Sequence, residues 1–430
     1  MTVTLPHEWA KIHADSKPDA PAVVSPGGTM PYGELDRRAE SHALRLTEAG
    51  IGAGDVVPFE ATATPEAVVA LVGIHRSGAA AVPHGPHGFD RRASVPPGTY
   101  AVLPTSGSAG KPRDVVLTGS NIGASVDACR RRLGNDATDR WLLTLPLFHV
   151  GGLSIVWRSL TAGGSIAMLP RFDAAAATRV LRDPTVSMAS LVPTMLHRIL
   201  HLDSGPYRGL KAILLGGAPA SAELIERGLV AGLPVLQTYG MTETASQVAT
   251  VEPGTAFESL GTAGPPLDGF AVSTSDDGEI LLEGTAISPG YLNEPPRSGP
   301  LHTGDLGHID RHGRLVVTGR RDGMIITGGE NVHPATVEAA INALASVGGS
   351  IVVGTPDDEW GHVVAAVVEA TPAALPAIEA AVRGRVAPHE MPRCWIPVGE
   401  LPLLENGKPD RAAASRLAVE AGSSDRRYAG

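Results

Sequence analysis

Short apolar runs alternate along the chain with longer segments of helical periodicity. Apolar runs at 142–145, 165–169 and 212–215 predict buried strands, and the segments 152–162 and 193–200 predict helices. Strands that alternate with helices favour a parallel sheet whose strands are buried on both faces. We therefore expect an α/β fold with its functional site beyond the carboxyl ends of the strands.

The pattern changes near Gly278. The segments 279–283 and 314–318 alternate or pair around turns, which predicts a β-rich portion, and a shorter α/β pattern resumes afterwards. We place a domain boundary near Asp322, between an N-terminal domain of residues 1–321 and a small C-terminal domain of residues 322–430. The later pattern predicts helices at 334–345 and 374–386 and strands at 349–353 and 363–369.

Composition narrows the classes of function. The chain has 430 residues, of which 43% are hydrophobic, and 35 Lys+Arg against 45 Asp+Glu give a formal net charge of −10. An acidic chain is not expected to have nucleic acid or an anionic membrane as its main partner. Cys129 and Cys394 are too few for a disulfide framework or a cysteine zinc site. No apolar run is long enough to span a bilayer and no signal segment is evident, so we expect a cytoplasmic protein.

Glycines and small hydroxyl residues cluster in the segment from Pro104 to Arg113, which reads Pro-Thr-Ser-Gly-Ser-Ala-Gly-Lys-Pro-Arg. Such a loop can turn its main-chain N–H groups inward to cradle phosphate, and Lys111 and Arg113 add cationic charge beside it. It is not a Walker A loop, because Pro112 follows Lys111. A flexible surface loop explains this segment equally well when it is taken alone.

Two later segments carry oxygen-bearing side chains. Thr242 and Glu243 follow a strand in Gln-Thr-Tyr-Gly-Met-Thr-Glu-Thr, where they are suited to hold Mg²⁺ while Tyr239 stacks on a base. Simple helix capping would also explain them. Asp305 in His-Thr-Gly-Asp, together with Arg320, is suited to bind ribose hydroxyls, although Gly-Asp is also common in turns.

Two further candidate segments lie in the C-terminal part. They are 326–332 (Ile-Thr-Gly-Gly-Glu-Asn-Val) and 405–411 (Glu-Asn-Gly-Lys-Pro-Asp-Arg), in which Lys408 is a cation on a short tether beside a glycine. Taken alone, Lys408 is an ordinary solvated loop lysine. Together, in this order and spacing, the five segments resemble the adenylate-forming superfamily of acyl-CoA synthetases, nonribosomal adenylation domains and luciferases, over about positions 20 to 412.

The resemblance implies a fold and an activity. The fold would be a large N-terminal domain with parallel α/β sheets and a β-rich subdomain, followed by a small mobile α+β C-terminal domain. The activity would be that of an AMP-forming acid–thiol ligase, which joins a carboxylate to the α-phosphate of ATP and then passes the acyl group to coenzyme A. Mg²⁺ would accompany ATP, and the protein would contribute mainly positioning and charge stabilisation.

Matched position by position, the resemblance implies a nucleotide site made of the phosphate loop, an adenine-contacting stretch, the turn after a strand and two ribose contacts. Tyr239 would stack on the base, and Thr242 would touch the α-phosphate. The members of this site are Thr105, Ser106, Gly107, Ser108, Ala109, Gly110, Lys111, Gly217, Ala218, Pro219, Tyr239, Gly240, Met241, Thr242, Asp305 and Arg320.

The resemblance also implies roles for the chemical step and for movement of the C-terminal domain. Glu243 would hold Mg²⁺, and Lys408 would bridge the acyl carboxylate and the α-phosphate. His149, in Pro-Leu-Phe-His-Val-Gly-Gly, resembles the histidine that gates the acyl pocket. Asp322 would be the hinge, and rotation about it would withdraw Lys408 and bring in the residues that line the pantetheine tunnel, Gly328, Gly329 and Glu330.

Three positions depart from the family pattern. Asp114 stands where glycine is usual, Ala109 replaces a hydroxyl donor, and Gly323 replaces an acid. A carboxylate beside the triphosphate would repel it by about 1–4 kcal/mol. We favour the interpretation that Asp114 points to solvent or pairs with Arg113. The alternative is an enzyme that is impaired in adenylation and acts on supplied acyl-AMP.

The segment from Leu145 to Leu160, and that from Tyr239 to Gln247, look like those of o-succinylbenzoate–CoA ligases of menaquinone synthesis. Compact ligases that activate aryl or polycyclic acids in natural-product pathways look similar, so both classes of acid stay open. A further alternative is a stand-alone adenylating enzyme that loads a carrier protein. Aromatic residues make up only 4% of the chain, so we expect an acyl pocket with aliphatic walls.

Overall fold

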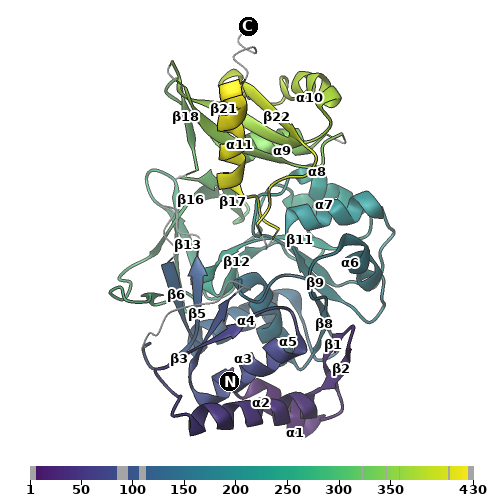
Figure 1. Cartoon of the computed structure of the whole chain (residues 1–430), viewed down its shortest axis with the longest axis vertical. Helices are drawn as coiled ribbons and strands as arrows, with labels where there is room; N and C mark the ends of the chain where they lie inside the picture. Colours follow the sequence, from purple (N-terminus) through teal and green to yellow (C-terminus); the bar gives the residue numbers. More distant parts are fainter. Residues whose placement is uncertain are drawn as a thin grey trace.

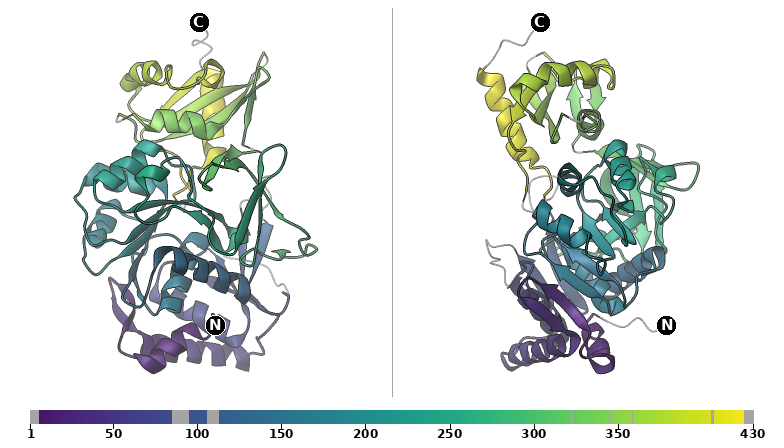
Figure 2. Two further views of the ribbon diagram at one scale, coloured as in Figure 1. Left: turned by 180° about the vertical axis from the view of Figure 1, so that it is seen from behind. Right: turned by 90° about the vertical axis from the view of Figure 1, so that its right-hand side faces the viewer.

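The computed structural model describes residues 6–84, 95–105, 113–321, 323–344, 346–357, 359–404 and 407–424. Three sheets belong to the N-terminal part and one to the C-terminal part. The C-terminal sheet lies at one end of the molecule, while α1 and α2 lie at the other (Figures 1 and 2). The mixed α/β fold with a large N-terminal and a smaller C-terminal part confirms the predicted fold class.

The central sheet has the strand order β12-β11-β10-β9-β7-β8-β1-β2. Its inner strands pair in parallel, and β8, β9 and β10 are buried along their whole length, as the apolar runs at 165–169 and 212–215 predict for β8 and β10. The strands are β1 (Pro21–Ser25), β2 (Gly28–Pro31), β7 (Arg140–Leu143), β8 (Ser165–Met168), β9 (Met188–Leu191), β10 (Ala212–Leu215), β11 (Val235–Met241) and β12 (Ser246–Thr250).

Hydrophobic cores cover both faces of the central sheet. Successive residues of β7 alternate between them, since Trp141 and Leu143 belong to one cluster and Leu142 to the other. The predicted helices at 152–162 and 193–200 are confirmed as α5 and α7. The helices between the strands are α5 (Val150–Ala162), α6 (Ala174–Leu181), α7 (Pro193–Leu202) and α8 (Ala222–Val230).

A second sheet, with the order β15-β6-β5-β4-β3, shares the first of these two cores. Helix α4 begins with a capping box between Thr118 and Asn121 and ends at Gly134, which has a φ of 65°. The strands and helices of this portion are β3 (Val56–Glu60), β4 (Ala80–His84), β5 (Thr99–Thr105), β6 (Arg113–Thr118), β15 (Gly290–Tyr291), α1 (Trp9–Ser16), α2 (Tyr32–Glu48), α3 (Pro65–Ser77) and α4 (Gly119–Leu133).

The predicted β-rich portion is an antiparallel sheet with the order β13-β14-β16-β17. Ile280, Leu282 and Leu315 point from it into a separate small core. Its register places Asp305 opposite Arg320. The strands are β13 (Phe270–Thr274), β14 (Glu279–Gly284), β16 (Leu301–Ile309) and β17 (Leu315–Arg320), and 3₁₀ turns lie nearby at η1 (Thr242–Thr244) and η2 (Phe257–Ser259).

The C-terminal sheet has the order β19-β18-β21-β20, and β22 pairs with β21. The predicted helix at 374–386 is shorter in the structure, because α10 ends before Gly384, a poor helix former. The elements are β18 (Ile325–Thr327), β19 (Glu330–Val332), β20 (Ser350–Asp357), β21 (Gly361–Glu369), β22 (Cys394–Val398), α9 (Pro334–Asn342), α10 (Leu375–Val382), α11 (Arg411–Ser424), η3 (Pro372–Ala374) and η4 (Pro388–Glu390).

Within the part of the chain that the structure describes, no helix combines the length and the apolar character that crossing a membrane requires.

Candidate functional site

Lys408 of the C-terminal part lies against the carboxyl end of β10 in the N-terminal part. Gly217 has a φ of 80°, and a Cβ atom added to it would lie 3.1 Å from Cε of Lys408. Only glycine accepts both this backbone conformation and this close approach. Lys408 and Gly217 are therefore brought together as the resemblance implies, at the edge of the sheet where α/β proteins bind ligands.

The loop that carries Lys408 is fixed by contacts with α7. Thr194 donates its hydroxyl to the carbonyl oxygen of Gly407 at 2.8 Å, and Arg198 forms an ion pair with Glu400 at 3.1 Å. Within the loop, Leu404 donates its N–H to the carbonyl oxygen of Lys408 at 2.8 Å. Burial lowers the pKa of Lys408 below its usual value. These contacts fix the position of the loop beside α7 and the carboxyl end of β10.

His149 lies in the same region, immediately before the first turn of α5. Its ring centroid is 4.6 Å from that of Phe148. Burial, and then the charge of Lys408, lower the pKa of His149 to about 4. The imidazole is therefore neutral at physiological pH, which suits a residue that lines an apolar acyl pocket rather than one that carries charge.

Tyr239, Asp305 and Arg320 form one hydrogen-bonded group. The hydroxyl of Tyr239 donates to Oδ2 of Asp305 at 2.6 Å, and Nη1 of Arg320 lies 3.3 Å from Oδ1. Burial raises the pKa of Tyr239, and the Asp305 charge raises it further, so the phenol stays protonated. An aromatic ring beside an oriented carboxylate is suited to a nucleoside, with the ring at the base and the carboxylate at the ribose.

Glu243 lies in the short turn η1, between the antiparallel strands β11 and β12. Tyr291 donates its hydroxyl to Oε1 of Glu243 at 2.9 Å. No cluster of three or more His, Cys, Asp or Glu residues that could hold a metal occurs among the described residues. A lone carboxylate still fits Mg²⁺, which commonly takes one or two protein carboxylates and completes its shell with phosphate oxygens and water.

The remaining predicted nucleotide residues of this region lie on the loop that follows β10 and at the end of β11. Ala218 and Pro219 follow Gly217, and Gly240 and Met241 end strand β11 directly before Thr242. The main-chain N–H of Met241 donates to the hydroxyl of Thr244 at 3.2 Å, which closes the turn.

Most of the predicted phosphate loop lies outside the described residues, namely Ser106, Gly107, Ser108, Ala109, Gly110 and Lys111. Its two ends are described and lie together, because Thr105 donates its hydroxyl to the carbonyl oxygen of Arg113 at 3.2 Å. The antiparallel pairing of β5 with β6 explains this closure, since it makes the loop the connection of a hairpin.

The structure corrects the interpretation of Arg113 and Asp114. Arg113 donates from Nε and Nη2 to the two carboxylate oxygens of Glu294, at 3.0 and 2.6 Å, so its charge is paired rather than offered to phosphate. Asp114 is only 7% exposed, so the expectation that it points to solvent is wrong. The ion pair of Arg113 is with Glu294 rather than with its neighbour Asp114.

Of the predicted tunnel residues, Gly328 and Gly329 form the turn between β18 and β19, and Glu330 begins β19. A Cβ atom added to Gly328 would lie 2.5 Å from the ring of Trp360, whereas one added to Gly329 would meet nothing within 4 Å. The predicted hinge residue, Asp322, lies outside the described residues.

The sequence analysis included Arg158 only within the segment from Leu145 to Leu160 and assigned its charge no role. Arg158 is 2% exposed on α5. Its Nη2 donates to the hydroxyl of Ser246 at 2.9 Å, while its Nε has no hydrogen-bond partner among the described residues. The signal was present in the sequence, because an arginine interrupts an otherwise apolar helix.

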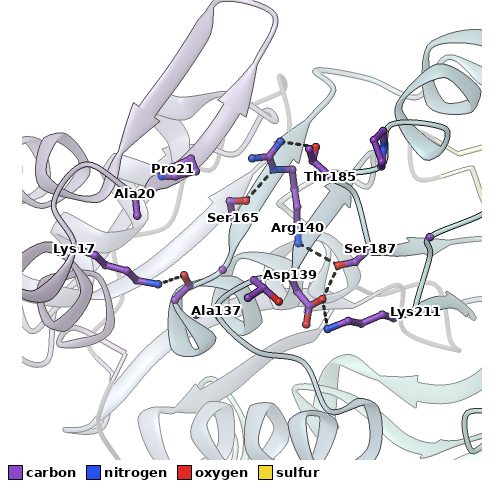
Figure 3. A pocket seen from close by; sticks show the side chains of 15 residues that line it. Lys17, Ala20, Pro21, Ala137, Asp139, Arg140, Ser165, Thr185, Ser187 and Lys211 are labelled. Carbon is purple, nitrogen blue, oxygen red and sulfur yellow. Dashed lines mark hydrogen bonds and ion pairs between the residues drawn. The ribbon is translucent and has the colours of Figure 1, made fainter.

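A cavity of about 450 Å³ lies elsewhere, at the amino ends of the central strands (Figure 3). Its cations already have protein partners: Lys211 binds Asp139 at 2.8 Å, and Arg140 donates to the hydroxyls of Ser165 and Thr185. None of the predicted site residues lines it, so we do not place the reaction there.

The chain is similar in sequence to known proteins and protein families. The family model described as AMP-binding enzyme matches residues 10–96 and 90–292, and that of the AMP-binding enzyme C-terminal domain matches residues 336–408. A 2-succinylbenzoate–CoA ligase of Listeria monocytogenes is 38% identical over 321 residues, which cover 73% of this chain and 69% of the relative. One of Bacillus mycoides is 37% identical, over 74% of this chain and 70% of the relative.

Solved structures of similar fold include o-succinylbenzoate–CoA synthetase of Bacillus subtilis with its acyl-adenylate intermediate. That structure has a TM-score of 0.83 and 27% identity, and the match covers 98% of each chain. The same enzyme with ATP and a magnesium ion gives a TM-score of 0.81 and 28% identity, over 94% of this chain and 98% of the other.

Proposed function

We propose a function from one premise: the chain belongs to the family of AMP-binding enzymes. It is an ATP-dependent carboxylate–CoA ligase, which forms an acyl-adenylate and then an acyl-CoA thioester, and it uses ATP, Mg²⁺ and coenzyme A. The observation that carries the proposal is the position of Lys408, a lysine from the C-terminal part that is buried against Gly217 at the ligand-binding edge of the central sheet.

In the first half-reaction, a carboxylate oxygen of the acid attacks the α-phosphorus of ATP, and the bond to pyrophosphate breaks. Both reactants are anions, so their approach requires a positive charge between them. Lys408 supplies it, Thr242 touches the α-phosphate, and Tyr239 and Asp305 orient the nucleoside. Bound Mg²⁺ would offset the charge of the phosphates, and Glu243 is the residue that would hold it.

In the second half-reaction, the thiol sulfur of coenzyme A attacks the acyl carbonyl carbon, the bond to AMP breaks, and the thiol proton is lost to solvent. Gly328, Gly329 and Glu330 line the path of the pantetheine arm in this proposal. In this proposal the C-terminal domain (322–430) turns relative to residues 1–321, with Asp322 as the hinge, so that these residues take the place of Lys408. Removal of Lys408 from the site leaves room for the thiol.

The proposed acid is 2-succinylbenzoate, which carries a second carboxylate besides the one that is activated. The names of the relatives support this choice, and so does Arg158. A buried guanidinium without an ion-pair partner among the described residues is costly, and a carboxylate of the substrate would offset that cost. Recognition of a dicarboxylate therefore explains why an arginine is kept in an apolar helix.

Replacing Arg158 tests the choice of acid. Arg158→Met is expected to lower kcat/KM for 2-succinylbenzoate by roughly 100-fold, because a charge-assisted hydrogen bond is worth about 1.5–3 kcal/mol and an unpaired carboxylate is left buried. Turnover of 4-oxo-4-phenylbutanoate, which lacks the ring carboxylate, should change by less than about threefold. Steady-state kinetics with both acids measures the difference, and an equal loss with both would contradict the role of Arg158.

A second candidate follows from Asp114: an enzyme impaired in adenylation that acts on supplied acyl-AMP. It predicts that Asp114→Gly tightens ATP binding and speeds pyrophosphate release by about tenfold, equivalent to about 1.4 kcal/mol. ATP affinity and pyrophosphate release of the variant and the wild type measure this. Robust pyrophosphate release by the wild type, unchanged in the variant, would exclude this candidate and leave the two-step ligase.

A third candidate function differs in the molecule that receives the acyl group, which would be a carrier protein rather than coenzyme A. Adenylation would be unaffected, so exchange of pyrophosphate would proceed without turnover of coenzyme A. Rescue of acyl transfer by a carrier protein would select this candidate, and thioester formation with free coenzyme A would exclude it.

A further inference from the structure

A chain of contacts joins the end of the phosphate loop to Glu243. Tyr291, on strand β15, donates its hydroxyl to Oε1 of Glu243 at 2.9 Å. The main chain near it is tied to the same turn, since Ser288 donates its N–H to the carbonyl oxygen of Glu243 at 2.7 Å. Strand β15 pairs with β6, which places Tyr291 opposite Val115. Both the side chain and the backbone of Glu243 are thus held by one short segment, residues 288–291.

The guanidinium of Arg113 packs on the ring of Tyr291 and holds the ring in place. The centre of its guanidinium lies 3.3 Å from the ring centroid, and its two bonds to Glu294 lock the guanidinium in plane. Arg113 and Glu294 are 45% and 42% exposed, so the ion pair alone contributes little stability. Its effect is geometric: it keeps the guanidinium on the ring and away from the nucleotide phosphates.

We propose that Tyr291 is a positioning residue for Glu243, and that Arg113, the first described residue after the phosphate loop, holds Tyr291 in place with the help of Glu294. The proposal rests on the proposed function, in which Glu243 holds Mg²⁺. The hydroxyl of Tyr291 occupies one oxygen of the carboxylate and leaves the other for the cation.

Another part of the chain offers a matched control. Arg182 lies 4.9 Å from the ring centroid of Tyr207 and forms two bonds to Asp203, at 2.6 and 2.7 Å. As in the first group, an arginine lies over a tyrosine ring and pairs with a carboxylate, but here the tyrosine hydroxyl donates to the main-chain oxygen of Asp203 at 3.4 Å, and no residue of the proposed nucleotide site takes part. Tyr207→Phe therefore measures what the loss of such a hydroxyl costs when no metal carboxylate is involved.

The experiment measures ATP binding to the full chain and its variants by calorimetry, in the absence of the carboxylic acid substrate. Each protein is titrated in EDTA and then at rising Mg²⁺ concentration. Tyr291→Phe should raise the half-saturating Mg²⁺ concentration about tenfold, since a hydrogen bond to a charged group is lost. Its ATP affinity in EDTA should stay within twofold of the wild type. Arg113→Lys, which keeps the charge but not the planar fork, should raise the Mg²⁺ requirement about threefold. Tyr207→Phe should change neither quantity.

Glu243→Gln separates failure of this proposal from failure of the metal assignment. An increased Mg²⁺ requirement in Glu243→Gln but not in Tyr291→Phe would overturn the positioning role and leave the metal assignment intact. No change in either variant would overturn the assignment of Glu243 itself, and the positioning role with it. A loss of ATP affinity in Tyr291→Phe that is equally large in EDTA would also overturn the proposal, because it would show a merely structural role.

Discussion

Lys408→Ala is expected to abolish acyl-adenylate formation while leaving thioester formation from supplied acyl-AMP nearly intact. The ammonium is the charge that lets a carboxylate approach the α-phosphate, and loss of such a group costs on the order of 100- to 1,000-fold in rate. The effect is confined to one half-reaction, because acyl-AMP already contains the bond that Lys408 helps to form. The position of Lys408 beside Gly217 supports this expectation.

Separate assays of the two half-reactions measure the effect. Pyrophosphate release reports adenylation, and conversion of synthetic acyl-AMP with coenzyme A reports thioester formation. Lys211→Ala is the matched control, since Lys211 binds Asp139 in the cavity at the amino ends of the strands. It should leave both half-reactions within about twofold. An equal loss of both half-reactions in Lys408→Ala would contradict the role assigned to this lysine.

Gly329→Leu is expected to have the opposite effect. In the structure, an added Cβ at Gly329 meets nothing within 4 Å, so adenylation should continue at close to the wild-type rate. After rotation of the C-terminal domain, the same side chain would enter the path of the pantetheine arm. Displacing the thiol by even about 1 Å costs roughly 100-fold, so thioester formation should fall at least that far.

A control is needed for backbone strain, because Gly329 has a φ of 86° and a non-glycine residue there costs about 1–2 kcal/mol. Gly313 has a φ of 77° and equally open surroundings in the turn between β16 and β17. Gly313→Leu should lose similar thermal stability without losing thioester formation. Thioester formation at the wild-type rate in Gly329→Leu would show that the tunnel is placed wrongly.

Much of the fold follows from local patterns. The apolar runs predicted the buried strands β8 and β10, because strands buried on both faces are mostly apolar. The ends of elements were predicted less well, as with α10, whose end at Val382 depends on a nearby glycine. The division at Asp322 stays a prediction, since that residue lies outside the described part of the chain.

The candidate site was proposed from motifs that carry their own chemistry, as for Tyr239, Asp305 and Lys408, whose roles stay predictions. It was not predictable where chemistry depends on a distant partner. Arg113 had the sequence signature of a phosphate-binding cation, but Glu294, 181 residues later, pairs with it because β15 lies beside β6. Such a contact is fixed by the pairing of strands and leaves no trace in the neighbouring sequence.

The central claim is a two-step ligation, and one measurement tests it most directly. Purified protein is supplied with ATP, Mg²⁺ and 2-succinylbenzoate, and pyrophosphate is followed before and after coenzyme A is added. The account predicts an acid-dependent burst of pyrophosphate with acyl-AMP held on the enzyme, followed on addition of coenzyme A by steady formation of thioester and AMP in equal amounts. Absence of acid-dependent pyrophosphate release, or a burst that coenzyme A never converts to thioester, would contradict it.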